Sequence, residues 1–238
     1  MNLVYWYMNS DQTQILREKY NPDGSALRRD QLELLRMLQF VAEICRDNGI
    51  RWWLSSGTLL GAARHKGFIP WDDDMDIVML REDYDRFEKL MLSRDDDEFV
   101  YHCMKSDVEY VNVFGKFRKK NDPVFAADQR SKYFKYQGVG LDVFSLEKSN
   151  RFAAHMAKFL YQNLIHPTQY IKNRFWRHFA IKSVQLLNFG LLIPLCRLIG
   201  RINHKGQYRY KLGSGFYQCG FSAEDILPLR TMEFEGIE

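Results

Sequence analysis

Residues 53–80 read WLSSGTLLGAARHKGFIPWDDDMDIVML, and this stretch decides the fold. The segment Ile50-Arg-Trp-Trp-Leu54, which overlaps the start of this stretch, is short and rich in β-formers and predicts a strand at residues 50–54. A Ser-Ser-Gly-Thr turn then leads into a helical segment at residues 59–64. After a loop, the acidic run at residues 72–76 passes directly into four apolar residues. This order predicts a buried strand with carboxylates at its entrance.

The flanking segments continue this mixture of helices and strands. Apolar residues at steps of four and three predict an amphipathic helix at residues 28–48, ended by Gly49, and helical spacing returns at residues 81–92. Three further apolar segments predict strands, at residues 99–103, 111–117 and 140–146. Residues 152–201 are expected to form one or two helices, the acidic run 95–98 a solvated loop, and residues 221–238 a loop with a short strand. The sequence therefore predicts an α+β fold.

The acidic run has a spacing that suits metal binding. In an extended backbone Asp72, Asp74 and Asp76 point to one side, while Met75, Ile77 and Met79 face the other layer. Three neighbouring carboxylates repel one another, and a divalent cation with a preference for oxygen ligands removes that repulsion. The pattern therefore predicts a site for Mg²⁺ or Mn²⁺.

Three other interpretations of the acidic run fit the sequence less well. An EF-hand loop fails because its sixth position holds Ile77 instead of Gly and its twelfth holds Asp83 instead of Glu. A solvated acidic loop does not explain why the acids run without a break into an apolar strand. A helix N-terminus is disfavoured by the β-branched pair Ile77-Val78.

A further acid, Asp142, lies within the apolar segment Gly138-Val-Gly-Leu-Asp-Val-Phe-Ser-Leu. A charged residue inside a buried strand requires an ionic partner or a metal. One interpretation is a structural ion pair. The functional interpretation is that a neighbouring strand brings Asp142 to the same ion site as the acidic run.

Gly57 and Thr58 supply a second component. A Gly-containing turn that opens a helix exposes backbone N–H groups that can hold phosphate. This signal is weak alone, but the acids follow some fifteen residues later. A phosphate-binding turn, a DxD pair and a third acid on another strand are the parts that metal-assisted phosphoryl or nucleotidyl transfer needs, with one carboxylate free to accept a proton.

Cations after this turn are candidate donor ligands. Arg64, His65 and Lys66 follow the predicted helix and either contact a donor diphosphate or form a basic surface loop. Lys116, in a segment of alternating residues, is a comparable candidate. His65 is expected to be a loop residue because the carboxylates already supply hard oxygen donors.

Composition limits the class of protein. At 238 residues, with 46% hydrophobic and 27% charged residues, the chain suits one domain with an appendage and a core that needs no disulfides. The four cysteines have no CxxC or metal-finger spacing, which predicts buried free thiols in a reducing compartment. The N-terminus lacks a signal-peptide pattern, and no apolar run reaches a membrane-spanning length, residues 186–199 being too short and interrupted. A cytoplasmic protein is expected.

Charge divides the chain in two. Residues 151–211 contain eleven Lys and Arg and no acid, which leaves 23 basic against 30 acidic residues elsewhere, a balance of −7. The basic segment is also aromatic, and three interpretations remain: a helical lid with solvated cations, docking on an anionic membrane surface, or binding of a polyanion. Because no RNA- or DNA-binding motif is present, no nucleic-acid partner is expected. Membrane docking would place the protein peripherally at the inner face of the plasma membrane.

The stretch from Trp53 to Ile77 resembles the signature of the LicD family, which includes fukutin and fukutin-related protein. Further similarity lies at Lys116 in GKFRKK, at Leu141-Asp-Val-Phe, and near the end at Leu227-Pro-Leu and Glu233-Phe-Glu-Gly. Matching pieces run from about residue 30 to residue 236. Family members usually continue beyond the Phe-Glu-Gly element with a segment containing a Tyr-Gly pair, whereas this sequence ends at Glu238.

The resemblance implies a fold and an activity. The fold is that of a DNA polymerase β-like nucleotidyltransferase, with a mixed, mainly antiparallel sheet flanked by helices. Asp74 and Asp76 correspond to the paired metal ligands, Asp142 to the third, and Asp72 to an additional one. Family members transfer a phospho-alcohol such as phosphocholine from a CDP-linked donor to a sugar hydroxyl of a glycan, and CMP leaves. The implied partners are therefore a CDP-linked alcohol and a glycan or lipid-linked glycan, in the synthesis of lipopolysaccharide, capsule or teichoic acid.

The expected organisation has four parts: an N-terminal extension (1–27), a nucleotidyltransferase-like catalytic core (28–150), a basic aromatic helical segment (151–211) and a C-terminal segment returning to the core (212–238). Two rival functions remain. One is an ordinary nucleotidyltransferase that places a nucleotide on a small molecule or sugar phosphate and releases pyrophosphate. The other is a truncated remnant that binds the donor without turnover.

Overall fold

The computed structural model describes residues 10–121, 131–202, 204–213 and 219–238. The first nine residues, on which the expected absence of a signal peptide depends, lie outside the described residues. The α-helices are α1 (Ser10–Tyr20), α2 (Ala26–Asp47), α3 (Ser56–His65), α4 (Arg81–Ser93), α5 (Arg151–Leu160), α6 (Arg174–Leu187), α7 (Ile193–Arg201) and α8 (Ala223–Ile226). The strands are β1 (Trp53–Leu54), β2 (Asp76–Leu80), β3 (Phe99–His102), β4 (Gly115–Lys119), β5 (Gly140–Lys148) and β6 (Tyr208–Tyr210).

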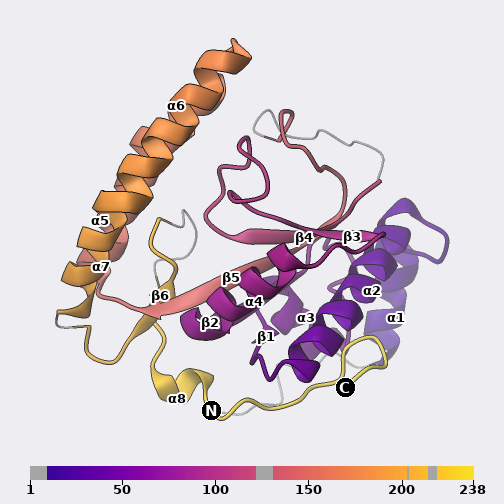
Figure 1. The fold of residues 1–238 in the computed structure, drawn as a ribbon. Helices are drawn as coiled ribbons and strands as arrows, with labels where there is room; N and C mark the ends of the chain where they lie inside the picture. The colour runs from indigo at the N-terminus through magenta and orange to yellow at the C-terminus, as the bar shows by residue number, and fades with distance from the viewer. Residues whose placement is uncertain (1–9, 122–130, 203, 214–218) are drawn as a thin grey trace.

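The strands form one sheet in the order β1-β2-β5-β4-β3, and β6 pairs with the far end of β5 (Figure 1). The β2–β5 pair is parallel, and the other pairs are antiparallel. The structure therefore confirms a mixed, mainly antiparallel sheet in an α+β fold. The strong central pairing of β2 with β5 sets the position of the acidic residues.

One face of the sheet carries the main core. Met75, Ile77 and Met79 are fully buried there, which confirms the alternation expected from the sequence. They pack with apolar residues of α2 and α4, including Leu34 and Phe87. α2 is formed as predicted, because its buried residues recur at helical spacing and Ser25 caps its first turn by accepting a hydrogen bond from the Arg28 N–H.

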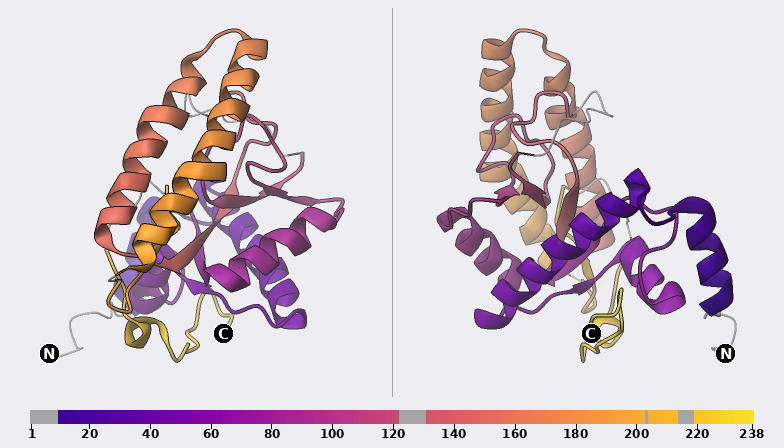
Figure 2. Two further views of the ribbon diagram at one scale, coloured as in Figure 1. Left: turned by 60° about the vertical axis from the view of Figure 1, so that its left-hand side comes forward. Right: turned by 90° about the vertical axis from the view of Figure 1, so that its right-hand side faces the viewer.

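Residues 151–202 form a helical hairpin, in which α5 runs alongside the longer helix built from α6 and α7 (Figure 2). A π turn at Tyr161–Ile165 and a 3₁₀ turn at His166–Tyr170 complete its first arm. A second π turn at Asn188–Leu192 joins α6 to α7 without interruption. Ala153, Ala157 and Cys196 form the small core between the two arms.

The structure corrects the expectation that no apolar run reaches membrane-spanning length. Arg174–Arg201 is one 28-residue helix with a mean hydropathy of 1.6 over 18 residues, long and apolar enough by length and composition to cross a membrane. The expected interruptions do not break the helix. The π turn contains Asn188 and Gly190, and Pro194 follows shortly after it, where the hydrogen-bond pattern is already irregular.

Other expectations from the sequence are confirmed in part. Residues 111–114 are irregular, so that strand begins at Gly115, and β1 is shorter than residues 50–54. Cys45, Cys103 and Cys196 are buried free thiols as predicted, whereas Cys219 is exposed. The tail contains the short helix α8 and isolated bridges instead of a strand. Residues 95–98 form a loop, as expected from their charge.

Candidate active site

A row of polar side chains crosses the face of the sheet opposite the main core. In strand register, Asp76 of β2 pairs with Asp142 of β5, Asp142 with Lys116 of β4, and Lys116 with His102 of β3. Because neighbouring strands lie about 4.8 Å apart and residues in register share a face, these four side chains stand next to one another. The neighbouring strand thus brings Asp142 beside the acidic run, as the sequence suggested.

The turn before α3 fixes the start of β2. The Asp76 N–H donates to the Thr58 hydroxyl oxygen at 2.8 Å, and the Asp76 carbonyl accepts from the Ser55 N–H at 2.9 Å. The Ser55 side chain does not cap α3 but lies 3.0 Å from the Tyr210 hydroxyl. Thr58, predicted as a donor ligand, therefore positions Asp76 through its buried hydroxyl.

The acids before β2 lie close to the same turn. The predicted buried strand with carboxylates at its entrance is confirmed, because β2 begins at Asp76 and the irregular residues 72–75 lead into it. The Asp72 Oδ2 lies 2.5 Å from the position that a Cβ on Gly57 would occupy, so any larger residue there would displace the carboxylate. Gln31 of α2, fully buried, donates to the Asp72 carbonyl at 2.9 Å. Gly57 thus gives Asp72 room beside the start of α3.

Lys116 neutralises part of the negative charge of the aspartates. Its Nζ lies 2.9 Å from the Asp142 Oδ1, a buried atom that is left without a well-aligned hydrogen bond. Across the described residues, no three Asp, Glu, His or Cys side chains already converge as a metal-binding group. The ion pair draws the Asp142 carboxylate towards β4. It agrees with the interpretation that Asp142 has a structural ionic partner.

The carboxylates of the site carry more negative charge than Lys116 neutralises. Burial, and then the nearby Asp142 and Asp74, raise the pKa of Asp76 to about 7. Burial and the neighbouring Asp74 and Asp73 raise the pKa of Asp72 to about 6. Burial also raises the pKa of Asp142, against the opposing effect of Lys116. Carboxylate oxygens whose ionisation is disfavoured by one another fit a hard divalent cation, which would restore their charged form.

These raised pKa values predict how stability depends on pH. The ordinary Asp pKa is 3.8, so between about pH 4 and pH 7 the native protein holds protons that the unfolded chain has lost. The free energy of unfolding in EDTA is therefore expected to fall with rising pH, by about 3 kcal/mol more in the parent protein than in Asp76→Asn. Urea unfolding at pH 4.5 and pH 8 measures this difference, and identical changes in the two proteins would contradict it.

Three predicted donor ligands lie elsewhere. Arg64 and His65 end α3 and Lys66 caps it, about 10–14 Å along the helix from Gly57. His65 Nδ1 lies 3.2 Å from the Thr13 hydroxyl of α1, and Lys66 Nζ lies 2.9 Å from Glu233. Their proposed contact with a donor diphosphate stays a prediction. The structure does not bring them next to the acids.

Sequence reasoning missed several residues around the site. His102 is fully buried at the end of the polar row, and its Nε2 lies 2.9 Å from Asp107. Glu235 supports the loop that leads to the acids: it accepts from Arg28 Nη2 at 2.7 Å and from the Phe68 N–H at 3.1 Å. Glu235 lies in the Glu233-Phe-Glu-Gly element that carries the family resemblance, but its contact with Arg28, 207 positions away, has no signal in the sequence.

Two cavities lie outside the polar row. A cavity of about 640 Å³ lies between α2, β1 and the C-terminal residues 224–238. Another, of about 600 Å³, lies between α4 and the second arm of the helical hairpin. Lys182 and Lys211 line the second cavity, and burial lowers the pKa of Lys211.

The fold and the site together define an α+β domain in which the sheet face opposite the main core carries a registered pair of aspartates beside a Gly-Thr helix start. A family model described as "LicD/FKTN/FKRP, nucleotidyltransferase domain" matches residues 49–186, more than half of the chain. The chain belongs to the LicD family. The match covers the acidic run, Lys116, Asp142 and most of the helical hairpin.

Individual relatives match over shorter stretches. The lipopolysaccharide cholinephosphotransferase LicD of Haemophilus influenzae is 51% identical over 61 residues, which is 26% of this chain and 23% of that protein. The ribitol 5-phosphate transferase FKRP of Homo sapiens is 44% identical over 52 residues, 22% of this chain and 10% of FKRP. The uncharacterized protein RP689 of Rickettsia prowazekii is 31% identical over 115 residues, 40% of this chain and 42% of RP689. The matches therefore span less than half the length of these relatives.

Proposed function

We propose that this protein is a metal-dependent phosphotransferase that moves a phospho-alcohol from a CDP-linked donor to a sugar hydroxyl of a cell-surface glycan. The observation that carries the proposal is the register of Asp76, Asp142 and Lys116 on three adjacent strands. Family membership and the cholinephosphate and ribitol-phosphate transferases among the relatives support this class of reaction. The proposed fold is that of a DNA polymerase β-like nucleotidyltransferase.

In the proposed reaction the acceptor hydroxyl oxygen forms a bond to the phosphorus that bears the alcohol. The bond from that phosphorus to the bridging oxygen of the diphosphate breaks, and CMP leaves with that oxygen. The hydroxyl proton passes to a carboxylate of the site. A bound Mg²⁺ or Mn²⁺, held by Asp74, Asp76 and Asp142 with Asp72 as an additional ligand, would neutralise charge on the diphosphate.

The protein's own residues supply the remaining functions. Lys116, next to Asp142, presents a cation to a donor phosphate. The first turn of α3 lies beside Asp76, and helix N–H groups there favour an anion. Thr58 holds Asp76 in place, and Gly57 leaves room for Asp72. These contacts position the carboxylates before substrate arrives, which lowers the cost of organising them during the reaction.

Ligand-dependent stability is the first test of this proposal. We expect CDP-choline or CDP-ribitol together with Mg²⁺ or Mn²⁺ to raise the melting temperature of the protein. A ligand at a hundredfold excess over its dissociation constant stabilises the native state by about 2.7 kcal/mol. The same ligands are expected to have no effect on Asp76→Asn. Product analysis of the parent protein with a glycan acceptor then distinguishes CMP release from pyrophosphate release.

Each alternative function has its own result in this experiment. Stabilisation by nucleoside triphosphates in place of CDP-alcohols, with pyrophosphate as product, would replace the proposal with an ordinary nucleotidyltransferase. Metal-dependent binding of a CDP-alcohol without any product would indicate a binding remnant. No response to any nucleotide would contradict both the donor and the site.

A further inference from the structure

The second arm of the helical hairpin exposes an apolar surface of unusual extent for a helix of this length. Within the 18-residue apolar window of Arg174–Arg201 only 22% of the residues are buried, whereas a core helix of a globular protein is mostly buried. We define the apolar stripe by six residues: Phe175 (69% exposed), Phe179 (60%), Leu186 (77%), Leu191 (53%), Leu195 (49%) and Leu198 (60%). Such a surface marks an interaction site.

The π turn keeps this stripe on one side of the helix. From Leu186 to Leu191 the exposed residues step by five, and the stripe then continues at steps of four and three. The buried side makes the same step of five from Asn188 to Ile193. The π turn accommodates one additional residue, which would otherwise rotate the following residues by about 100°. The sequence positions of both faces therefore move by one, and the exposed and buried sides keep their directions through α6 and α7.

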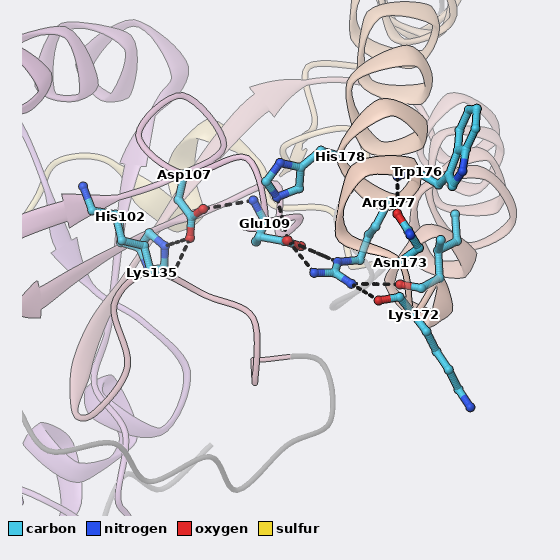
Figure 3. A network of polar contacts seen from close by, with 10 residues as sticks. His102, Asp107, Glu109, Lys135, Lys172, Asn173, Trp176, Arg177 and His178 are labelled. Atoms are coloured by element: carbon cyan, nitrogen blue, oxygen red, sulfur yellow. Dashed lines mark hydrogen bonds and ion pairs between the residues drawn. The ribbon is translucent and has the colours of Figure 1, made fainter.

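Two ion pairs fix the helix along the side of the domain. At one end, the Arg177 guanidinium donates to both carboxylate oxygens of Glu109 at 2.8–3.1 Å, and His178 lies 2.7 Å from the same acid (Figure 3). Twenty residues further on, about 30 Å along the helix, Arg197 Nε lies 2.8 Å from Glu147 of β5. A membrane-crossing orientation would break both pairs or draw the sheet into the bilayer. The helix is therefore held lengthwise against the domain. The stripe faces outward except at Leu186, which is exposed at the edge of the cavity beside α4.

The charge of the hairpin selects the kind of surface that fits it. Residues 151–211 contain eleven Lys and Arg and no acid, and the exposed cations Arg174, Lys182 and Arg201 lie on the same helix as the stripe. On the neighbouring arm, Phe152 and Phe159 are 66% and 64% exposed. Two copies of such a hairpin repel each other electrostatically, whereas anionic headgroups above an apolar layer match both its cations and its apolar residues.

We propose that the helical hairpin docks in the plane of an anionic lipid bilayer. The apolar stripe enters the boundary between headgroups and acyl chains, and Arg174 and Arg201 contact lipid phosphates. The helix lies on the membrane and does not span it. This inference stands on the hairpin alone and does not depend on the identity of the donor or on the acid site.

Vesicle binding tests the proposal. The whole chain is mixed with vesicles of phosphatidylcholine alone, or of phosphatidylcholine with phosphatidylglycerol, and the bound fraction is measured by co-sedimentation. We expect binding to the anionic vesicles that decreases with salt, at least a tenfold weaker binding for Phe175→Ser/Phe179→Ser/Leu186→Ser, and a smaller loss for Arg174→Gln/Arg201→Gln. The matched control is Ile15→Ser/Leu32→Ser, which replaces exposed apolar residues on α1 and α2 and should bind as the parent does.

Two measurements keep the result interpretable. Thermal unfolding establishes that the stripe variant folds, which is expected because all three replaced side chains are exposed. Sedimentation velocity establishes the oligomeric state of parent and variant. Equal vesicle binding by parent and stripe variant would overturn the proposal. A parent that is dimeric and binds no vesicles, together with a stripe variant that is monomeric, would also overturn it. Nucleotide-dependent stability, which depends on the acid site, is expected to be unchanged in the stripe variant.

Discussion

Asp76→Asn and Asp142→Asn are each expected to reduce phospho-alcohol transfer by about 10³-fold while the protein remains folded. The two carboxylates are in register on adjacent strands, so each substitution removes one of two neighbouring negative charges from the proposed cation site. Loss of metal-assisted charge stabilisation of several kcal/mol corresponds to a rate decrease of this size. Turnover is measured as CMP release from a CDP-alcohol in the presence of a glycan acceptor.

Asp95→Asn is the matched control for both variants. Asp95 is an acid in the exposed loop at residues 95–98, with a side chain that is 98% exposed and 2.9 Å from Lys120. Its replacement should leave turnover unchanged. Asp76→Asn should melt at or above the temperature of the parent in EDTA, because burial and repulsion by Asp142 and Asp74 disfavour the charged Asp76 carboxylate. Parent-like turnover in both Asn variants would remove the acids from the mechanism.

Glu109→Gln is expected to lower the free energy of unfolding by about 3 kcal/mol. Glu109 holds a bidentate pair with Arg177 and also contacts His178, and the side chains of Glu109 and Arg177 are 10% and 4% exposed. Removing one charge of a buried pair leaves the other without compensation, which costs more than the pair itself contributes. Figure 3 shows how this contact connects the loop before β4 to the hairpin.

A double variant separates the loss of the pair from the burial of an unpaired charge. Glu109→Gln/Arg177→Met removes both charges and should recover more than half of the stability lost in Glu109→Gln. Urea unfolding of the parent, both single variants and the double variant gives the coupling energy. Additive losses in the double variant would show that the pair does not couple the hairpin to the loop.

The sequence allowed the local elements to be predicted because their signals are local. The helical spacing of α2 and the alternation of Met75, Ile77 and Met79 depend only on residues a few positions apart, and the structure confirms both. The location of Asp142 on a neighbouring strand was also foreseen. Its register with Asp76 was not, since register is set by the packing of whole strands and not by the segment itself.

Features that depend on distant partners could not be predicted. Glu109 lies 68 positions before Arg177, and nothing in either segment indicates the other. His102 reads as an ordinary strand residue until β3 is paired with β4. The π turn at Asn188–Leu192 was also missed, because Gly190 and Pro194 indicate an interruption by local propensity, whereas packing of the hairpin keeps the helix continuous.

The contact between Arg28 and Glu235 has a consequence for the order in which the protein is made. These residues are separated by 207 positions, and the Arg28 guanidinium is buried beneath the loop that leads to the acids. A chain that emerges from the ribosome N-terminus first exposes Arg28 long before its partner carboxylate exists. The sheet and α2 can form earlier, but the support behind the acidic loop is completed only after Glu235 has been synthesised.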